Sequence, residues 1–187
     1  LAELFYHCVV EKVFPVSSPR TAETTKLFEN TFRAVNIALV NELMVMCNLL
    51  GVDVWEVIEA ARTKPFGFMA FYPGPGTGGH CIPVDPQYLA WKMQMLDYNA
   101  RFVRLSMEIN NSMPRYVFDR ISKLLDSRGQ VVHTSSIVIL GVSYKANIGD
   151  LRESPALELL RLFIQEGIDV SVDGDTNGLG QYGYYCW

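Results

Sequence analysis

The feature that most constrains the fold is a stretch from Arg20 to Leu50 that contains no proline and no glycine. Ser18 followed by Pro19 is a good helix start, because serine caps free N–H groups and proline is tolerated at the first helical position. Gly51 favours a helix end. Apolar residues recur at helical spacing, namely Leu27, Phe28, Phe32, Val35, Leu39, Leu43, Met46 and Leu50. We expect one helix over 19–50, about 45 Å long at 1.5 Å per residue, suited to a domain spine or a dimer seam.

Shorter helices are expected to follow this one. Asp53 is a candidate cap for the segment VWEVIEAARTK. A loop over 65–83 then leads to a helix that starts at Asp85 or Pro86 and includes QYLAWKMQML. A further helix is expected over 100–125, where Pro114 predicts a kink or a break.

The pattern changes after Gly129. A buried strand is expected over 137–141, an amphipathic helix over 155–165 and a second strand over 168–172. This order predicts a βαβ unit, the opening of a doubly wound α/β sheet. The fold class is therefore a mainly α domain followed by the start of an α/β domain.

Composition excludes several classes of function. The hydrophobic content is 49%, the charged content 19% and the net charge −4, so we expect no nucleic-acid partner. The four cysteines form no CxxC pair, which argues against zinc and favours a reducing, cytoplasmic setting. No apolar run approaches the ~20 residues of a membrane span, so no membrane association is expected.

The loop YPGPGTGGHCIPVDP, residues 72–86, holds one cysteine, Cys81, among its glycines and prolines. Two interpretations remain open on the residues themselves. Cys81 is either an incidental buried thiol in a tight connection or a nucleophile on a backbone close to a ligand. Asp85, four residues on, is either a helix cap or a carboxylate that orients a proton or a water.

Two further pairs of polar residues also allow two interpretations each. Lys26 and Asn30 share a helix face that continues roughly through Arg33, Ile37 and Asn41. This face is either solvated, the interpretation that spacing favours, or a pair of donors to a developing oxyanion. In the loop 141–154, Lys145 and Arg152 are either surface charge or anion ligands, and the loop does not match GxGxxG.

Three ordered segments together resemble the UDP-sugar 6-dehydrogenases, within the UDP-glucose/GDP-mannose dehydrogenase family. They are TTKLFENTFRAVNIALVNE (24–42), GPGTGGHCIPVDP (74–86) and GVSYK…RESPALEL (141–159). The second segment looks most like the UDP-N-acetylhexosamine branch. The resemblance implies UDP-N-acetylglucosamine as the expected substrate, with UDP-N-acetylmannosamine or UDP-glucose as alternatives.

The resemblance also implies domains and partners. Residues 1–17 would end an NAD-binding Rossmann domain, 18–130 would form a central helical dimerisation domain, and 131–187 would begin a Rossmann-like UDP-binding domain. We therefore expect a piece of a longer protein that forms a homodimer through the helix 19–50. The main NAD-binding domain would lie outside this chain.

The family's site residues carry over by position. Cys81 matches the nucleophile that captures an aldehyde-level C6 as a thiohemiacetal, which a second oxidation converts to a thioester. Lys26 and Asn30 match the oxyanion-stabilising pair, Asp85 matches the carboxylate that assists proton transfer, and Arg152 matches an NAD contact. Substrate contacts are expected from Phe71, Tyr72, Gly74, Gly78, Tyr144 and Lys145.

Two other functions compete with this one. The chain could be a non-catalytic dimerisation or binding module of the same family, because it has no GxGxxG fingerprint. A cysteine hydrolase is less favoured, because no histidine and asparagine partners stand out. We expect the isolated chain to have no dehydrogenase activity.

Overall fold

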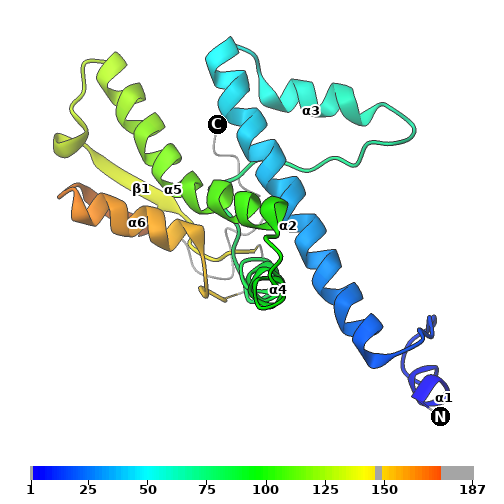
Figure 1. Cartoon of the computed structure of the whole chain (residues 1–187). Helices are drawn as coiled ribbons and strands as arrows, with labels where there is room; N and C mark the ends of the chain where they lie inside the picture. The colour runs from blue at the N-terminus through cyan, green and yellow to red at the C-terminus, as the bar shows by residue number, and fades with distance from the viewer. Residues whose placement is uncertain (1, 146–148, 174–187) are drawn as a thin grey trace.

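The computed structural model describes residues 2–145 and 149–173. In order, its elements are α1 (Ala2–Tyr6), α2 (Pro19–Leu50), α3 (Val54–Arg62), α4 (Asp85–Gln94), α5 (Arg101–Ser127), the short 3₁₀ turn η1 (Val132–Thr134), β1 (Ser136–Leu140), α6 (Pro155–Gln165) and β2 (Asp169–Asp173). Helix α2 forms a diagonal spine, with α1 at its free end and the βαβ unit beyond α5 (Figure 1). The expected fold class, helical and then α/β, is confirmed.

Helix α2 has the ends that the sequence predicts. The Ser18 hydroxyl accepts a hydrogen bond of 3.1 Å from the Thr21 N–H, and Pro19 occupies the first turn. Gly51 adopts the left-handed conformation, with φ of 68°, and closes the helix through a hydrogen bond to the Cys47 carbonyl.

The buried face of α2 differs from the apolar stripe that the sequence indicates. Its buried residues are mostly small or polar: Asn30, Thr31, Ala34, Ala38, Val40, Asn41, Met44 and Cys47. Large apolar residues of the stripe lie outside, with Phe28 63%, Leu39 58% and Leu50 75% exposed. Small side chains let α5 approach α2 closely, whereas the large ones project away from it. The stripe is therefore not the core face within this chain.

Helix α5 continues through Pro114, which is buried in its middle. Of the two expected alternatives, a break is wrong, whereas a kink agrees with the bend that Figure 1 shows partway along α5. One core cluster fills the space between α2, α3 and α5 and consists of Val40, Met44, Cys47, Val54, Ile58 and Met113.

The βαβ unit packs on the second half of α5. Strands β1 and β2 are parallel, with Ile137 opposite Val170, and α6 connects them. A second core cluster joins this unit to α5 through Phe118, Leu159, Phe163 and Ile168. The strands begin and end within one residue of their expected bounds. Residues 174–187 of the expected third domain lie outside the described residues.

Among the described residues, α2 is the single helix whose length and apolar composition would permit it to cross a membrane. Core helices meet the same criterion, and α2 buries Asn30, Thr31 and Asn41 on its inner face.

Candidate functional site

The glycine-rich loop runs from α3 to α4 and carries Cys81 at its end. Pro73 and Pro75 are buried along it, and Cys81 is exposed. The Cys81 carbonyl accepts a hydrogen bond of 2.8 Å from the Asp85 N–H, which ties the cysteine to the first turn of α4. The thiol is thus held at a helix start and remains open to reagents. Cys81 is not an incidental buried residue.

Glycine is required in this loop because another loop packs against it. A Cβ on Gly78 would lie 2.5 Å from the Tyr144 Cβ and 2.9 Å from the Glu153 carbonyl oxygen. Gly79 has a φ of 85° and lies under the Tyr144 ring. Its N–H donates a hydrogen bond of 3.2 Å to the Arg152 carbonyl. Tyr144 and residues 152–155 therefore pack directly on these glycines.

Asn30 and Asp85 meet beside Cys81. The Asn30 amide donates a hydrogen bond of 2.5 Å to the Asp85 carboxylate, and Asn30 is only 3% exposed. The solvated-face interpretation is wrong for Asn30, although Lys26, one turn earlier, is exposed. Asp85 is the first residue of α4, while Val84 occupies the cap position. The Asp85 carboxylate is therefore bound to α2 and does not cap its own helix.

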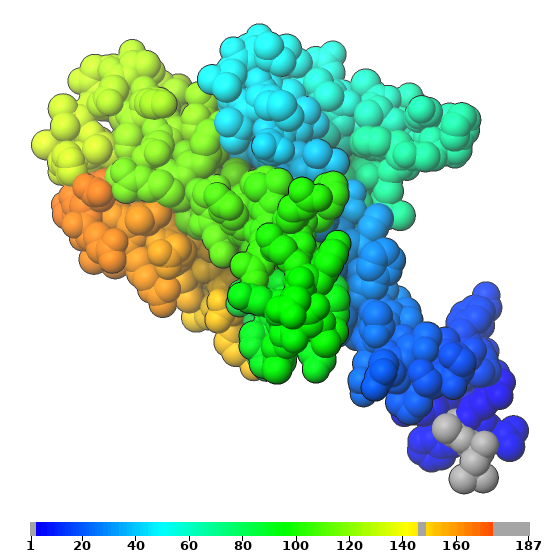
Figure 2. Space-filling view, viewed as in Figure 1, coloured from blue at the N-terminus to red at the C-terminus, as the bar shows by residue number. Residues whose placement is uncertain are grey.

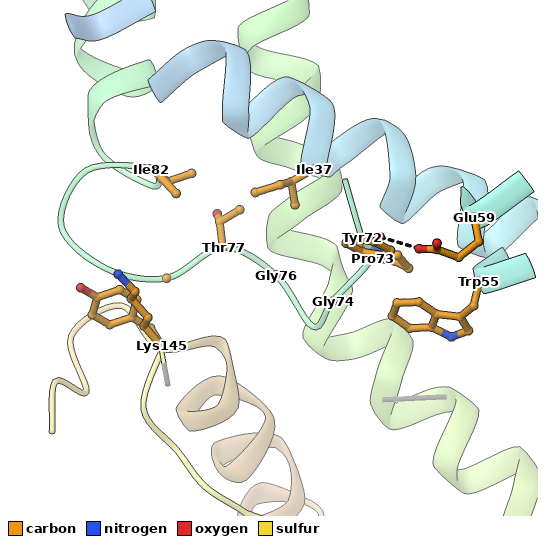
Figure 3. A pocket seen from close by; sticks show the side chains of 12 residues that line it. Ile37, Trp55, Glu59, Tyr72, Pro73, Gly74, Gly76, Thr77, Ile82 and Lys145 are labelled. Carbon is orange, nitrogen blue, oxygen red and sulfur yellow. Dashed lines mark hydrogen bonds between the residues drawn. The ribbon is translucent and has the colours of Figure 1, made fainter. Parts of the chain in front are cut away.

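A cavity of about 730 Å³ lies along the glycine loop (Figure 3). Five residues expected to contact substrate line it, and they come from both domains: Tyr72, Gly74, Gly78, Tyr144 and Lys145. The sequence interpretation missed the rest of its lining, which comprises Ile37, Trp55, Glu59, Pro73, Gly76, Thr77 and Ile82.

One end of the cavity is aromatic. The Trp55 and Tyr72 rings stack with their centroids 5.9 Å apart, and the Tyr72 hydroxyl donates a hydrogen bond of 2.5 Å to Glu59 (Figure 3). Arg62 donates to the same hydroxyl, which, with Glu59, raises the pKa of the guanidinium. Trp55 and Glu59 are four residues apart on α3, and this spacing was the only sequence signal that they share a face.

The other expected site residues do not line this cavity, namely Lys26, Asn30, Phe71, Cys81, Asp85 and Arg152. The Phe71 ring packs edge-on against Phe32, at 5.9 Å between centroids, and does not line this cavity. Arg152 lines a second, more polar cavity of about 570 Å³, which shares Gly76 and Thr77 with the first.

Arg152 is already paired within the chain. Its Nε lies 2.8 Å from Asp150 Oδ1 and its Nη2 2.6 Å from Oδ2. These hydrogen bonds hold the pKa of the Asp150 carboxyl well below its usual range and raise the pKa of Arg152. The pair presents a fixed guanidinium plane at the surface.

The described residues fit neither a metal nor a complete dinucleotide. No group of three or more histidine, cysteine or acidic side chains gathers in residues 2–145 and 149–173. Arg152 could contact NAD, but a single paired arginine is not enough to bind its pyrophosphate.

Fold and site together define a helical domain followed by the first βαβ unit of an α/β domain. The glycine-rich loop of the helical domain packs against the α/β domain, and residues of both domains line the cavity between them. The chain belongs to the UDP-glucose/GDP-mannose dehydrogenase family. Residues 20–112 match the central domain of that family and residues 138–174 match its UDP binding domain.

Relatives and solved structures agree with this family. The chain is 42% identical over 165 residues to an NDP-N-acetyl-D-galactosaminuronic acid dehydrogenase of Ralstonia solanacearum, covering 88% of this chain and 37% of the relative. It is 39% identical to a UDP-N-acetyl-D-mannosamine dehydrogenase of Escherichia coli K12, covering 88% and 39%. The structure of a UDP-D-ManNAc dehydrogenase from Pyrococcus horikoshii superposes with a TM-score of 0.84 at 35% identity, covering 91% of this chain and 40% of that one.

The chain thus spans less than two fifths of the length of these two sequence relatives.

Proposed function

We propose that this chain is the substrate-holding part of an NAD-dependent UDP-sugar 6-dehydrogenase, in which Cys81 is the covalent nucleophile. One observation carries the proposal. The loop that ends at exposed Cys81 also lines, through Gly74 and Gly78, the 730 Å³ cavity that Tyr144 and Lys145 complete from the UDP-binding domain.

We assign each polar group a role in this reaction. The Cys81 sulfur would bond to C6 of the sugar at the aldehyde level, which prevents a reactive aldehyde from escaping. Asn30 and Lys26 would stabilise the resulting oxyanion. Asp85, held by Asn30 one turn from Cys81, would orient the water that cleaves the thioester and would accept its proton. Lys145 would bind the diphosphate.

Two molecules of NAD, bound in turn, would each accept one of the two hydrides of this four-electron oxidation. For NAD the chain offers Arg152, positioned by Asp150, and we propose that the rest of the dinucleotide site lies in the part of the enzyme outside this chain. We also propose a cytoplasmic enzyme with no nucleic-acid or membrane partner.

The substrate is proposed to be a UDP-2-acetamido sugar. The motif GGHCIPVDP leads to UDP-N-acetylglucosamine as the expected sugar, whereas several relatives carry names that specify N-acetyl-D-mannosamine. The two epimers differ at C2, so side-by-side binding of both, with UDP-glucose for comparison, distinguishes the candidates.

A homodimer through α2 is part of the proposal. Its exposed stripe, from Phe28 through Phe32, Leu39 and Met46 to Leu50, is apolar over most of the helix length. In Figure 2 the first half of α2, in blue, extends away from the rest of the chain, where a second copy has room to pack. Burial of such a stripe is the usual reason for its composition.

Protection of Cys81 from alkylation tests the proposal on the chain itself. In a Cys8→Ser, Cys186→Ser background, iodoacetamide labelling of Cys81 is followed by mass spectrometry with and without each UDP-sugar. We expect labelling to slow severalfold with a UDP-acetamido sugar and not with GDP-mannose. Lys145→Ala should remove the protection, whereas Lys123→Ala on exposed α5 should not.

Equal labelling rates with and without all UDP-sugars would contradict the proposal. The catalytic and the binding-module alternatives separate in an enzyme that joins this chain to a dinucleotide-binding domain. There, Cys81→Ser should abolish acid formation and preserve UDP-sugar binding if the chain is catalytic.

A further inference from the structure

A single series of hydrogen bonds connects the glycine-rich loop to the two long helices. The Gly74 N–H donates to Asn41 Oδ1 at 2.9 Å. The Asn41 amide then donates to Asn110 Oδ1 at 3.0 Å, and the Asn110 amide donates to the Ala34 carbonyl at 3.0 Å. The series joins the loop, α5 and two turns of α2.

The two ends of the series fix its direction. A backbone N–H can only donate and a backbone carbonyl can only accept. With Gly74 at one end and Ala34 at the other, each asparagine must turn its oxygen toward the loop side and its nitrogen toward Ala34. Asparagine suits both positions, because its short side chain carries one acceptor and one donor group. Aspartate lacks the donor and alanine lacks both.

Burial makes the series expensive to interrupt. Asn41 is 0% exposed and Asn110 is 3% exposed, so water does not replace a lost partner at either residue. The backbone of Asn110 also contacts the loop, because its carbonyl would lie 3.1 Å from a Cβ on Gly76. Pro114, four residues on, has no N–H to bond that carbonyl within the helix.

We propose that Asn41 and Asn110 are positioning residues, which hold the glycine-rich loop, residues 73–81, in the conformation that shapes the 730 Å³ cavity. Asn41 does not line that cavity, and its effect on a ligand acts through Gly74, which does. The identity of the ligand as a UDP-sugar rests on the proposed function, whereas the hold on the loop does not.

The chain contains a matched control. Asn48 also lies on α2 and also bonds α5, through the Tyr116 hydroxyl and Arg120. It makes no hydrogen bond to the glycine-rich loop, and both of its hydrogen bonds are exposed. Asn48→Ala therefore removes a polar link between the same two helices without releasing Gly74.

Amide hydrogen exchange of the loop is the first measurement. In Asn41→Ala and Asn110→Ala we expect peptides covering residues 72–81 to exchange at least tenfold faster, with α6 unchanged. Asn48→Ala should leave the loop at the wild-type rate. Loop exchange that is unchanged in both asparagine variants, or is accelerated equally in Asn48→Ala, would overturn the proposal.

A double-variant cycle separates positioning from general destabilisation. Because Asn41 and Asn110 act in series, the combined variant should accelerate loop exchange no more than the stronger single variant. Asn48→Ala is expected to have no effect of its own on the loop, so adding it to Asn41→Ala should leave the effect of Asn41→Ala unaltered. Multiplicative effects of Asn41→Ala and Asn110→Ala on the loop would contradict a series. If Asn41→Ala does not fold, Asn110→Ala breaks the same series one link further from the loop.

A second measurement tests ligand binding. The affinities for UDP-N-acetylglucosamine and UDP-N-acetylmannosamine are measured by calorimetry on folded protein. We expect at least a tenfold loss in Asn41→Ala and Asn110→Ala and less than a twofold change in Asn48→Ala. If the wild-type chain binds neither sugar yet the loop exchanges as expected, the proposed function fails and the positioning role stands. Full affinity with a released loop would overturn the positioning role.

Discussion

The Asn30 amide donates a hydrogen bond of 2.5 Å to the Asp85 carboxylate across 55 residues of sequence. The contact joins the long helix α2 to the first residue of α4, which follows the loop that carries Cys81. Asn30 is buried and Asp85 half-buried, so the carboxylate is constrained on one side and available on the other. A group that must orient a water beside a thioester needs this kind of placement.

Replacing Asn30 by aspartate should make stability depend on pH. Two carboxyl groups would then share the position of the present hydrogen bond. Because two adjacent negative charges repel, one of the carboxyl groups should stay protonated at pH values above its usual pKa. A carboxyl whose pKa is raised on folding stabilises the fold only while it is protonated. The melting temperature of Asn30→Asp should therefore approach that of wild type near pH 4 and fall below it as the pH rises to 7.

Thermal melts over that pH range check this expectation. Asn36→Asp is the control, because Asn36 bonds only the Phe32 carbonyl of its own helix. A pH-independent difference between Asn30→Asp and wild type would contradict the shared-proton argument.

Gly78→Ala should destabilise the junction between the two domains by about 1–3 kcal/mol, the usual cost of overpacking. The new methyl group would lie 2.5 Å from the Tyr144 Cβ. Gly74→Ala is the matched control, since nothing lies within 4 Å of its Cβ position. Urea unfolding measures both variants, and equal midpoints would show that the loop over Gly78 yields without cost.

Arg152→Ala should raise the pKa of Asp150 toward the usual range for aspartate, although not fully, because the backbone N–H of residue 152 still donates to this carboxylate. In the wild-type chain the hydrogen bonds from Arg152 favour the charged carboxylate. The stabilisation from this pair is thus present above the pKa of the unfolded state and is lost as the pH falls below it. Carbon-13 NMR titration of the Asp150 carboxyl follows the change.

Arg161→Ala is the control for that titration, because Arg161 pairs with Glu158 on α6. An Asp150 pKa that is the same in wild type and Arg152→Ala would disprove the assignment of its cause.

Leu39→Glu should abolish dimerisation if α2 forms the proposed seam. Leu39 is 58% exposed in the middle of the apolar stripe, where a charge would have to be desolvated in the dimer. Ile164→Glu, at an equally exposed position on α6, should leave the association constant unchanged. Sedimentation velocity at micromolar concentration measures the association. A wild-type chain that is monomeric at this concentration would contradict the proposed dimer through α2.

The chain by itself should show no dehydrogenase turnover. Orientation of the reacting groups contributes roughly 7–11 kcal/mol to catalysis, and no phosphate cradle among the described residues would orient NAD. The purified chain is incubated with NAD and each UDP-acetamido sugar while absorbance at the NADH maximum is recorded. Sustained NADH formation that requires both compounds would contradict the expectation.

The sequence by itself determined the elements and the family. The ends of α2 depend on Ser18, Pro19 and Gly51, whose preferences are local and act within one helical turn. The start of α4 at Asp85 and the bounds of α6 follow from equally local signals. Ordered motifs in three segments were likewise enough to indicate the family, which the matches over residues 20–112 and 138–174 then showed.

Only the tertiary structure decided which side chains share a space. The buried face of α2 could not be derived from its apolar stripe, because burial depends on what packs against a helix, and α5 selects the face with Ala34 and Ala38. Trp55 and Glu59 reach the cavity from a helix outside the glycine-rich loop. Asn41 and Asn110, 69 residues apart, become one series with Gly74 only when three elements meet. Hydrogen bonds and packing are short-range in space, whereas the sequence records only neighbours along the chain.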